Sequence, residues 1–201
     1  MFDNELQKIA LYVFGQNGQS TDDLLKFCAE DYLLRRGENT TVVGVYRNDK
    51  GAPSLVGDGM PFVSASHSGQ FVVCAVSDGR VGVDLQEIRR FRGETADDQA
   101  KRLLHLAKRF FHPGDASWVK SDPFGRFFTV WSAKESYVKY TGDGIDDAFA
   151  SARAIPDGGP YGSEWECDGV YYYSLPFDEN YSFCVCCGYP AEIETTFVDS
   201  F

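Results

Sequence analysis

The sequence lacks an apolar run long enough to cross a membrane, and its start lacks the basic region and apolar block of a secretory signal peptide. These absences argue against a membrane-spanning segment, a membrane partner and secretion. With 201 residues, 43% of them hydrophobic, the chain can bury one substantial core. We therefore expect a cytoplasmic protein that folds without cross-links.

Histidine is scarce as well. None of the three histidines lies near one of the six cysteines at the spacing of zinc ligands. We therefore expect no zinc site, and we interpret the cysteines as reduced, mostly buried apolar residues.

Basic charge is low overall, because the formal net charge is -11. This balance argues against nucleic acid as a partner, since phosphate backbones favour basic surfaces. One stretch differs: residues 89–109 contain seven basic and three acidic side chains. It fits either a docking surface for an anionic partner or the solvated face of an amphipathic helix.

Apolar periodicity and turn residues predict both helices and strands. Ser20 should cap a helix that ends near Gly37, and Asp122 a helix that ends at Gly142. A third helix is expected around the apolar stripe at 103–111. Strands are expected at 6–14, 41–47, around Leu55, and at 61–65, 70–77, 80–86, 149–155, 169–175, 181–188 and 191–198.

Helices precede antiparallel strands in both halves, which predicts an α+β protein of two related lobes, each an antiparallel sheet packed with a long helix. We expect an N-terminal lobe of residues 1–92 and a C-terminal lobe of residues 93–201 that form one compact unit. Asp78-Gly79 should make a tight hairpin between strands 70–77 and 80–86, and 66–69 another turn.

The helix expected before Gly142 has an unusual face. Trp131, Glu135 and Lys139 are spaced at i, i+4 and i+8, so they lie on one side of the helix. Glu and Lys are rarely buried without a partner, and Trp is rarely fully exposed. A half-exposed helix with one ion pair is the simplest interpretation of these residues alone.

Strand 80–86 alternates, so Asp84 and Gln86 share a face while Val83 and Leu85 share the other. An aspartate near the end of an apolar strand is either a strand-end cap or a ligand held by a rigid element. The strand alone leaves both possibilities open.

Taken together, three motifs are more specific. Ser-His-Ser-Gly at 66–69, Gly-Val-Asp at 82–84, and Trp-Ser-Ala-Lys-Glu at 131–135 followed by Lys139 occur in this order, with Ala-Lys-Arg-Phe-Phe at 107–111 before the last. In this block, from about residue 50 to 144, the sequence resembles the 4′-phosphopantetheinyl transferases, specifically the type that activates nonribosomal peptide and polyketide synthases. The resemblance implies two lobes related by a pseudo-twofold axis, with the active site between them.

The resemblance also implies a reaction. The family moves the phosphopantetheine arm of coenzyme A to a serine of an acyl or peptidyl carrier protein and releases adenosine 3′,5′-bisphosphate. Mg²⁺, or Mn²⁺ in its place, would bind Asp84 and Glu135, with Gln86 as a weak ligand or one acting through water. Glu135 would also take the serine proton, and Lys139 would bind the diphosphate.

Further residues are implied in binding coenzyme A. His67 is similar to the family histidine that contacts a phosphate, with Ser66 beside it. Lys134 could reach a phosphate from the flank of the helix, or could be exposed to solvent. Trp131 is expected to pack rather than to contact substrate.

Two positions depart from the family pattern. Gln86 stands where many relatives have a third carboxylate, so we expect weaker metal binding without loss of function. Ala52 stands where relatives often carry a lysine that contacts the 3′-phosphate. Lys50, Arg47, Arg35 and Arg36 are the candidates to compensate.

Carrier proteins of this family are generally acidic, so the resemblance implies docking near Arg89, Arg102 and Arg109. Two lobes in one chain also imply that a monomer forms the active site. Two other functions remain open: a non-catalytic relative that binds coenzyme A or carriers, and a metal-dependent phosphoesterase.

Overall fold

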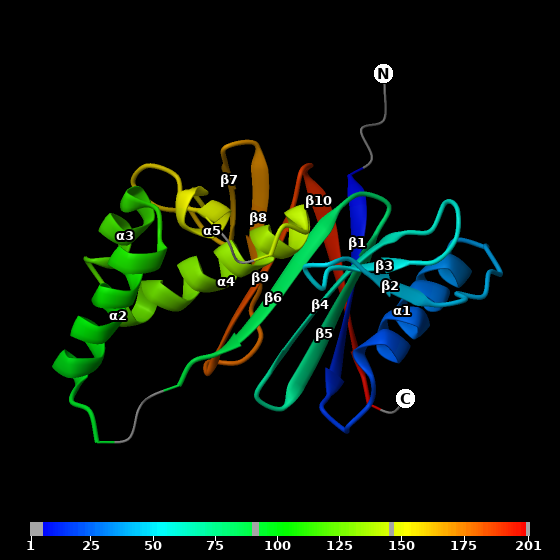
Figure 1. Ribbon diagram of the computed structural model, residues 1–201, viewed down its shortest axis with the longest axis horizontal. Helices are drawn as coiled ribbons and strands as arrows, with labels where there is room; N and C mark the ends of the chain where they lie inside the picture. The colour runs from blue at the N-terminus through cyan, green and yellow to red at the C-terminus, as the bar shows by residue number, and fades with distance from the viewer. Residues whose placement is uncertain (1–5, 90–92, 145–146, 200–201) are drawn as a thin grey trace.

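The computed structural model describes residues 6–89, 93–144 and 147–199, and these form a mixed α+β structure. Two four-stranded sheets pack against each other, with α1 (Thr21–Arg35) and a small hairpin toward one end of the molecule and the other helices toward the opposite end (Figure 1). The α+β class expected from the sequence is confirmed.

The first sheet contains the first strand of the described chain and is covered by α1. In spatial order its strands are β10 (Ala191–Val198), β1 (Gln7–Gly15), β5 (Phe71–Ser77) and β4 (Phe62–Ser68). Ser20 caps α1 as predicted, since its side chain accepts a hydrogen bond from the Asp22 amide at 3.3 Å. The hairpin of β2 (Val45–Arg47) and β3 (Pro53–Leu55) lies beside this helix.

The second sheet is covered by the long helix α4 (Pro123–Thr141). Its strands in spatial order are β6 (Val81–Glu87), β9 (Tyr181–Cys187), β8 (Val170–Ser174) and β7 (Glu164–Cys167). Asp122 caps α4, with Pro123 in its first turn, and Gly142 ends it in the left-handed conformation, as predicted. Helices α2 (Ala96–Phe110) and α3 (Pro113–Val119) pack against α4.

The two sheets pack face to face. One cluster of buried side chains joins alternate residues of β1 and β5, such as Leu11 and Val73, to alternate residues of β6 and β9, such as Val83 and Val185. The outer face of the first sheet packs on α1 and that of the second on α4. Because side chains alternate along a strand, residues of β6 that do not enter the shared core point toward α4.

Strand pairing differs from the expected hairpin at Asp78-Gly79. β5 pairs with β1 and β4, whereas the next strand, β6, pairs with β9 in the other sheet, so that prediction is wrong. The C-terminal strand β10 returns to the first sheet and runs parallel to β1. The first sheet is therefore mixed, and each half of the chain contributes a strand to the sheet of the other half.

Two local predictions also fail. Strand β4 continues through Ser68, so residues 66–68 are extended and the turn begins at Gly69. The strand expected at 149–155 is instead the short helix α5 (Asp147–Ser151), in which Phe149 is buried against Trp131. The structure also contains β7, which the sequence pattern did not reveal.

All six cysteines are buried and are free thiols. Within the described ranges, no helix is both long enough and apolar enough to span a bilayer.

Candidate active site

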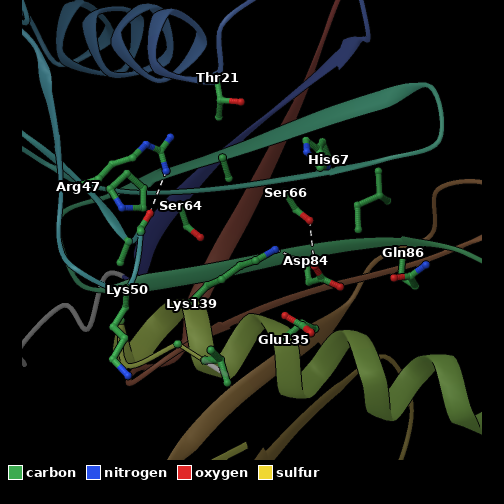
Figure 2. A pocket seen from close by; sticks show the side chains of 18 of the residues that line it. Thr21, Arg47, Lys50, Ser64, Ser66, His67, Asp84, Gln86, Glu135 and Lys139 are labelled. Carbon is green, nitrogen blue, oxygen red and sulfur yellow. Dashed lines mark hydrogen bonds and ion pairs between the residues drawn. The ribbon is translucent and has the colours of Figure 1, made fainter. Parts of the chain in front are cut away.

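A cavity of about 700 Å³ opens where β4, β6, α4 and the β2–β3 hairpin meet. Figure 2 shows acidic side chains from β6 and α4 facing it, with His67 and Gln86 at one end and Lys50 at the other. We call this space the central cavity. It brings together the three motifs that are far apart in the sequence.

Asp84 reaches the central cavity because of its place in β6. Val83 and Leu85 point into the core between the sheets, so Asp84 and Gln86 point to the α4 side, as the alternation predicts. A glycine lets the helix come close: a Cβ on Gly82 would lie 1.9 Å from the carbonyl oxygen of Ser136. This close approach of β6 and α4 sets Asp84 opposite Glu135.

The Asp84 side chain is buried, and its two carboxylate oxygens have different surroundings. Oδ1 accepts a hydrogen bond from Ser66 Oγ at 2.9 Å and from Lys139 Nζ at 2.7 Å. Oδ2 is buried and has no hydrogen-bond partner in the described part of the chain. A buried carboxylate oxygen without a partner is costly, which makes it a natural ligand for a cation.

Glu135 faces the same cavity from α4. Burial, together with the nearby charge of Asp84, raises the pKa of Glu135 to about 7, and Lys139 partly offsets this effect. Among the described residues, no hydrogen bond or ion pair holds its carboxylate. A carboxylate with a pKa near neutrality can accept a proton at physiological pH.

These two carboxylates fit a divalent cation that also binds phosphate and water. Mg²⁺ often takes only one or two protein carboxylates, with substrate phosphates and water completing its coordination. The described residues contain no cluster of three or more His, Cys, Asp or Glu side chains around one point. Gln86 lines the central cavity, and its amide nitrogen donates one hydrogen bond to the Glu87 carbonyl at 2.9 Å, a bond that leaves the side-chain oxygen unused.

The residues expected to bind coenzyme A divide into two groups. Ser66, His67, Lys50 and Lys139 all line the central cavity. Lys134 does not. It is 1% exposed and lies 3.5 Å from Asp115, donates a hydrogen bond to the Ala152 carbonyl, and has its ammonium 5.4 Å from the centroid of the Phe149 ring.

Lys134 is therefore part of the core behind α4, and both expectations for it, phosphate contact and solvent exposure, are wrong. The reason is geometric: Lys134 and Glu135 are adjacent in sequence, so they point to different sides of the helix. Trp131 packs on Phe111, Phe127 and Phe149, as expected, but it also lines the cavity.

The three arginines that were candidates to compensate for Ala52 lie in two different places. Arg47 lines the central cavity and pairs with Asp22 at 2.5 Å. Arg35 and Arg36 lie at the far end of α1 beside a second cavity of about 430 Å³. Sequence reasoning missed Thr21, the first residue of α1, although the Ser20 cap marked the start of that helix.

The basic stretch is partly neutralised. Arg89 pairs with Glu87 at 2.7 Å and Arg102 with Glu94 at 3.3 Å. Arg109 lies over the ring of Phe110, with 5.0 Å from its guanidinium carbon to the centroid. The stretch also includes residues 90–92, which lie outside the described residues.

Comparison with known proteins identifies relatives of this chain. The family model of the 4′-phosphopantetheinyl transferase superfamily matches residues 80–186, more than half of the chain. A 4′-phosphopantetheinyl transferase of Bacillus pumilus is 35% identical over 69% of this chain and 61% of its own length, and one of Bacillus subtilis is 30% identical over 66% and 61%. A third, from a Nostoc species, is 41% identical over 40% of this chain. The chain thus spans less than two thirds of the length of these relatives.

Proposed function

The chain belongs to the 4′-phosphopantetheinyl transferase superfamily, and we propose that it transfers the phosphopantetheine group of coenzyme A to a serine of an acyl or peptidyl carrier protein. One observation carries the proposal: Asp84 and Glu135 line the same cavity. Asp84 Oδ2 is buried and has no hydrogen-bond partner in the described structure, and the raised pKa of Glu135 suits that residue to accept a proton. Both residues lie in the segment that the family match covers.

Asp84 and Glu135 are the residues that would hold Mg²⁺, with the oxygen of Gln86 beside them, either as a weak ligand or through water. When bound there, the cation neutralises the diphosphate and makes its phosphorus more electrophilic. Mn²⁺, which accepts the same oxygen ligands, would serve in its place.

The remaining chemistry belongs to side chains of this chain. The carrier serine gives its proton to the Glu135 carboxylate while its oxygen forms a bond to the β-phosphorus of coenzyme A. The bond from that phosphorus to the bridging oxygen breaks, and adenosine 3′,5′-bisphosphate leaves with the electron pair. Lys139, held over the site by its 2.7 Å contact with Asp84, stabilises the negative charge that grows on the leaving phosphate.

Cationic and polar groups at the two ends of the cavity support binding of an elongated, phosphate-rich substrate. His67 lies at the end nearer Asp84, and Arg47 and Lys50 come from the β2–β3 hairpin. We propose that Lys50 and Arg47 supply the charge that Ala52 does not. Arg35 and Arg36 are excluded from this role by their position beside the second cavity.

For the carrier, we propose docking of an acidic surface near Arg89, Arg102 and Arg109. Since Arg89 and Arg102 already have carboxylate partners, Arg109 is the one of the three with the largest expected effect. Arg109→Glu should raise the KM for the carrier and leave the KM for coenzyme A unchanged. Unchanged carrier kinetics would contradict this docking site.

One assay separates the proposal from its alternatives. The protein is incubated with an apo carrier protein, coenzyme A and Mg²⁺, and the carrier is weighed by mass spectrometry, with a chelator as control. A gain of one phosphopantetheine group, lost with the chelator, supports the proposal. Binding of coenzyme A without that gain indicates a non-catalytic relative, and release of phosphate or nucleotide without carrier modification indicates a phosphoesterase.

A further inference from the structure

Three serines of β4 lie along the line where the two sheets meet. Ser64, Ser66 and Ser68 alternate in the strand and share one face. Ser64 Oγ accepts a hydrogen bond from the Val83 amide at 3.1 Å, and Ser68 Oγ accepts one from the Glu87 amide at 2.8 Å. These two serines therefore fasten β4 to the backbone of β6.

Ser66 does something different. Its hydroxyl donates to Asp84 Oδ1 at 2.9 Å (Figure 2), and the residue as a whole is 9% exposed. A serine hydroxyl has a single proton to donate. Because that proton is used on Asp84, Ser66 cannot donate to a phosphate while this bond holds, which departs from the contact that the sequence led us to expect.

The bond determines which Asp84 oxygen is available. Oδ1 accepts from both Ser66 and Lys139, whereas Oδ2 has no partner among the described residues. Two donors on one oxygen restrict the rotation of the carboxylate about its terminal bond. Oδ2 is therefore held in one orientation before any ligand arrives.

We infer that Ser66 is a positioning residue for the cation site: it orients Asp84 so that Oδ2 meets the cation, and it does not bind the phosphates of coenzyme A. The inference rests on the proposed function for the choice of cation and substrate. Groups that hydrogen-bond to a metal ligand commonly change metal affinity about 10- to 100-fold when removed, although they never touch the metal.

The test uses Mn²⁺ alone, titrated into the full chain and followed by electron paramagnetic resonance. Ser66→Ala should weaken Mn²⁺ binding about tenfold, the lower end of the range for such partners. Ser68→Ala is the matched control, because it also removes one serine bond between β4 and β6 but touches neither Asp84 nor the central cavity. It should leave Mn²⁺ affinity at the wild-type value.

A second titration, with adenosine 3′,5′-bisphosphate and no metal, separates positioning from phosphate contact. Ser66→Ala should leave this affinity unchanged. A Ser66→Ala variant with wild-type Mn²⁺ affinity, or one that loses bisphosphate affinity instead, would overturn the inference. If Ser66→Ala does not fold, as judged by thermal unfolding, Ser66→Cys replaces it, because a thiol keeps the size but donates weakly.

The outcome is independent of the transfer assay. If the wild-type protein modifies no carrier, the proposed function fails, while the Mn²⁺ comparison still decides the role of Ser66. If transfer is normal and Ser66→Ala binds Mn²⁺ like the wild type, only the role of Ser66 is overturned.

Discussion

Helix α4 carries two lysines, five residues apart, and each pairs with an aspartate from another element. The inner pair, Lys134 and Asp115, is sealed in the core, with side chains 1% and 0% exposed. The outer pair, Lys139 and Asp84, lines the central cavity, with side chains 28% and 8% exposed. The same two residue types therefore meet in two different environments.

The two pairs differ in how many of their carboxylate oxygens accept hydrogen bonds. In the inner pair, Asp115 also accepts the amides of Ala154 and Ile155 at 3.2 and 3.1 Å, and Lys134 donates to the Ala152 carbonyl. Both carboxylate oxygens are used, and the segment after α5 is fixed to α3 and α4. Burial lowers the pKa of Lys134, and the charge of Asp115 opposes that effect.

In the outer pair, Asp84 Oδ2 remains without a hydrogen-bond partner in the described structure. The Glu135 carboxylate lines the same cavity, and burial together with the charge of Asp84 raises its pKa to about 7. A pair that is fully hydrogen-bonded stabilises a fold, whereas a pair left incomplete next to a cavity can bind a ligand. On this basis we propose a structural role for the inner pair and a functional role for the outer pair.

One large expected effect comes from a variant that breaks the outer pair. Asp84→Asn keeps the shape of the side chain and its acceptor for Ser66, but removes the charge that would bind the cation. Transfer should fall about a hundredfold or more, since even partners of a metal ligand contribute about 10- to 100-fold. Carrier modification followed by mass spectrometry measures the rate, and a rate within a few-fold of wild type would contradict the functional role.

Breaking the inner pair should have a different consequence. Lys134→Met leaves Asp115 charged and buried, which typically costs about 3–5 kcal/mol. Chemical denaturation measures the loss, and the transfer rate per folded molecule should stay near that of the wild type. Adding Asp115→Asn should recover part of the stability, because the buried charge is then removed, and failure to recover any would contradict the ion-pair account.

The sequence predicted that Asp84 and Lys139 would face one site, but it did not predict that they would pair with each other. The spacing of Glu135 and Lys139 and the alternation around Asp84 follow from regular helix and strand geometry, which local residue patterns record. The inner pair depends on α3, a seven-residue helix, and on a loop after α5 that received the wrong secondary structure. The residues next to Asp115 in the sequence do not indicate that this side chain is buried.

The pairing of the strands was the other feature that the sequence did not predict. The alternation of β6 predicted which side Asp84 takes, but not that β6 would leave β5 and pair with β9. The parallel pairing of β10 with β1 joins residues more than 180 positions apart, for example Gln7 and Ala191. Such contacts depend on packing of the two sheets, so residue patterns within one strand do not reveal them.

The pH dependence of stability tests whether Glu135, beside the outer pair, is buried and titrates near neutral pH. Because the folded protein raises the pKa of Glu135 from 4.5 to about 7, protonated Glu135 favours the folded state. That contribution is complete below pH 4.5 and is lost as pH rises through about 7. Without metal, the wild type should lose stability over this range relative to Glu135→Gln, measured by thermal unfolding. Parallel curves for the two proteins would contradict the burial of a titrating Glu135.

The variant with the smallest expected effect adds a charge beside the outer pair. Gln86→Glu puts a third carboxylate on the same face of β6 as Asp84, and should raise Mn²⁺ affinity about three- to tenfold, since affinity grows with ligand charge. Calorimetric titration of both proteins provides the comparison. Unchanged or weaker binding would show that position 86 does not reach the cation.

The most direct test of the account is a single comparison of carrier modification by the wild type, Glu135→Gln and Lys134→Met, with each rate divided by the concentration of folded protein. We predict that Glu135→Gln folds and that its transfer falls by about 10² to 10⁴, the usual contribution of a general base. We predict that Lys134→Met, although less stable, transfers at close to the wild-type rate. Near-normal transfer by Glu135→Gln would contradict the assignment of catalysis to the outer side of α4.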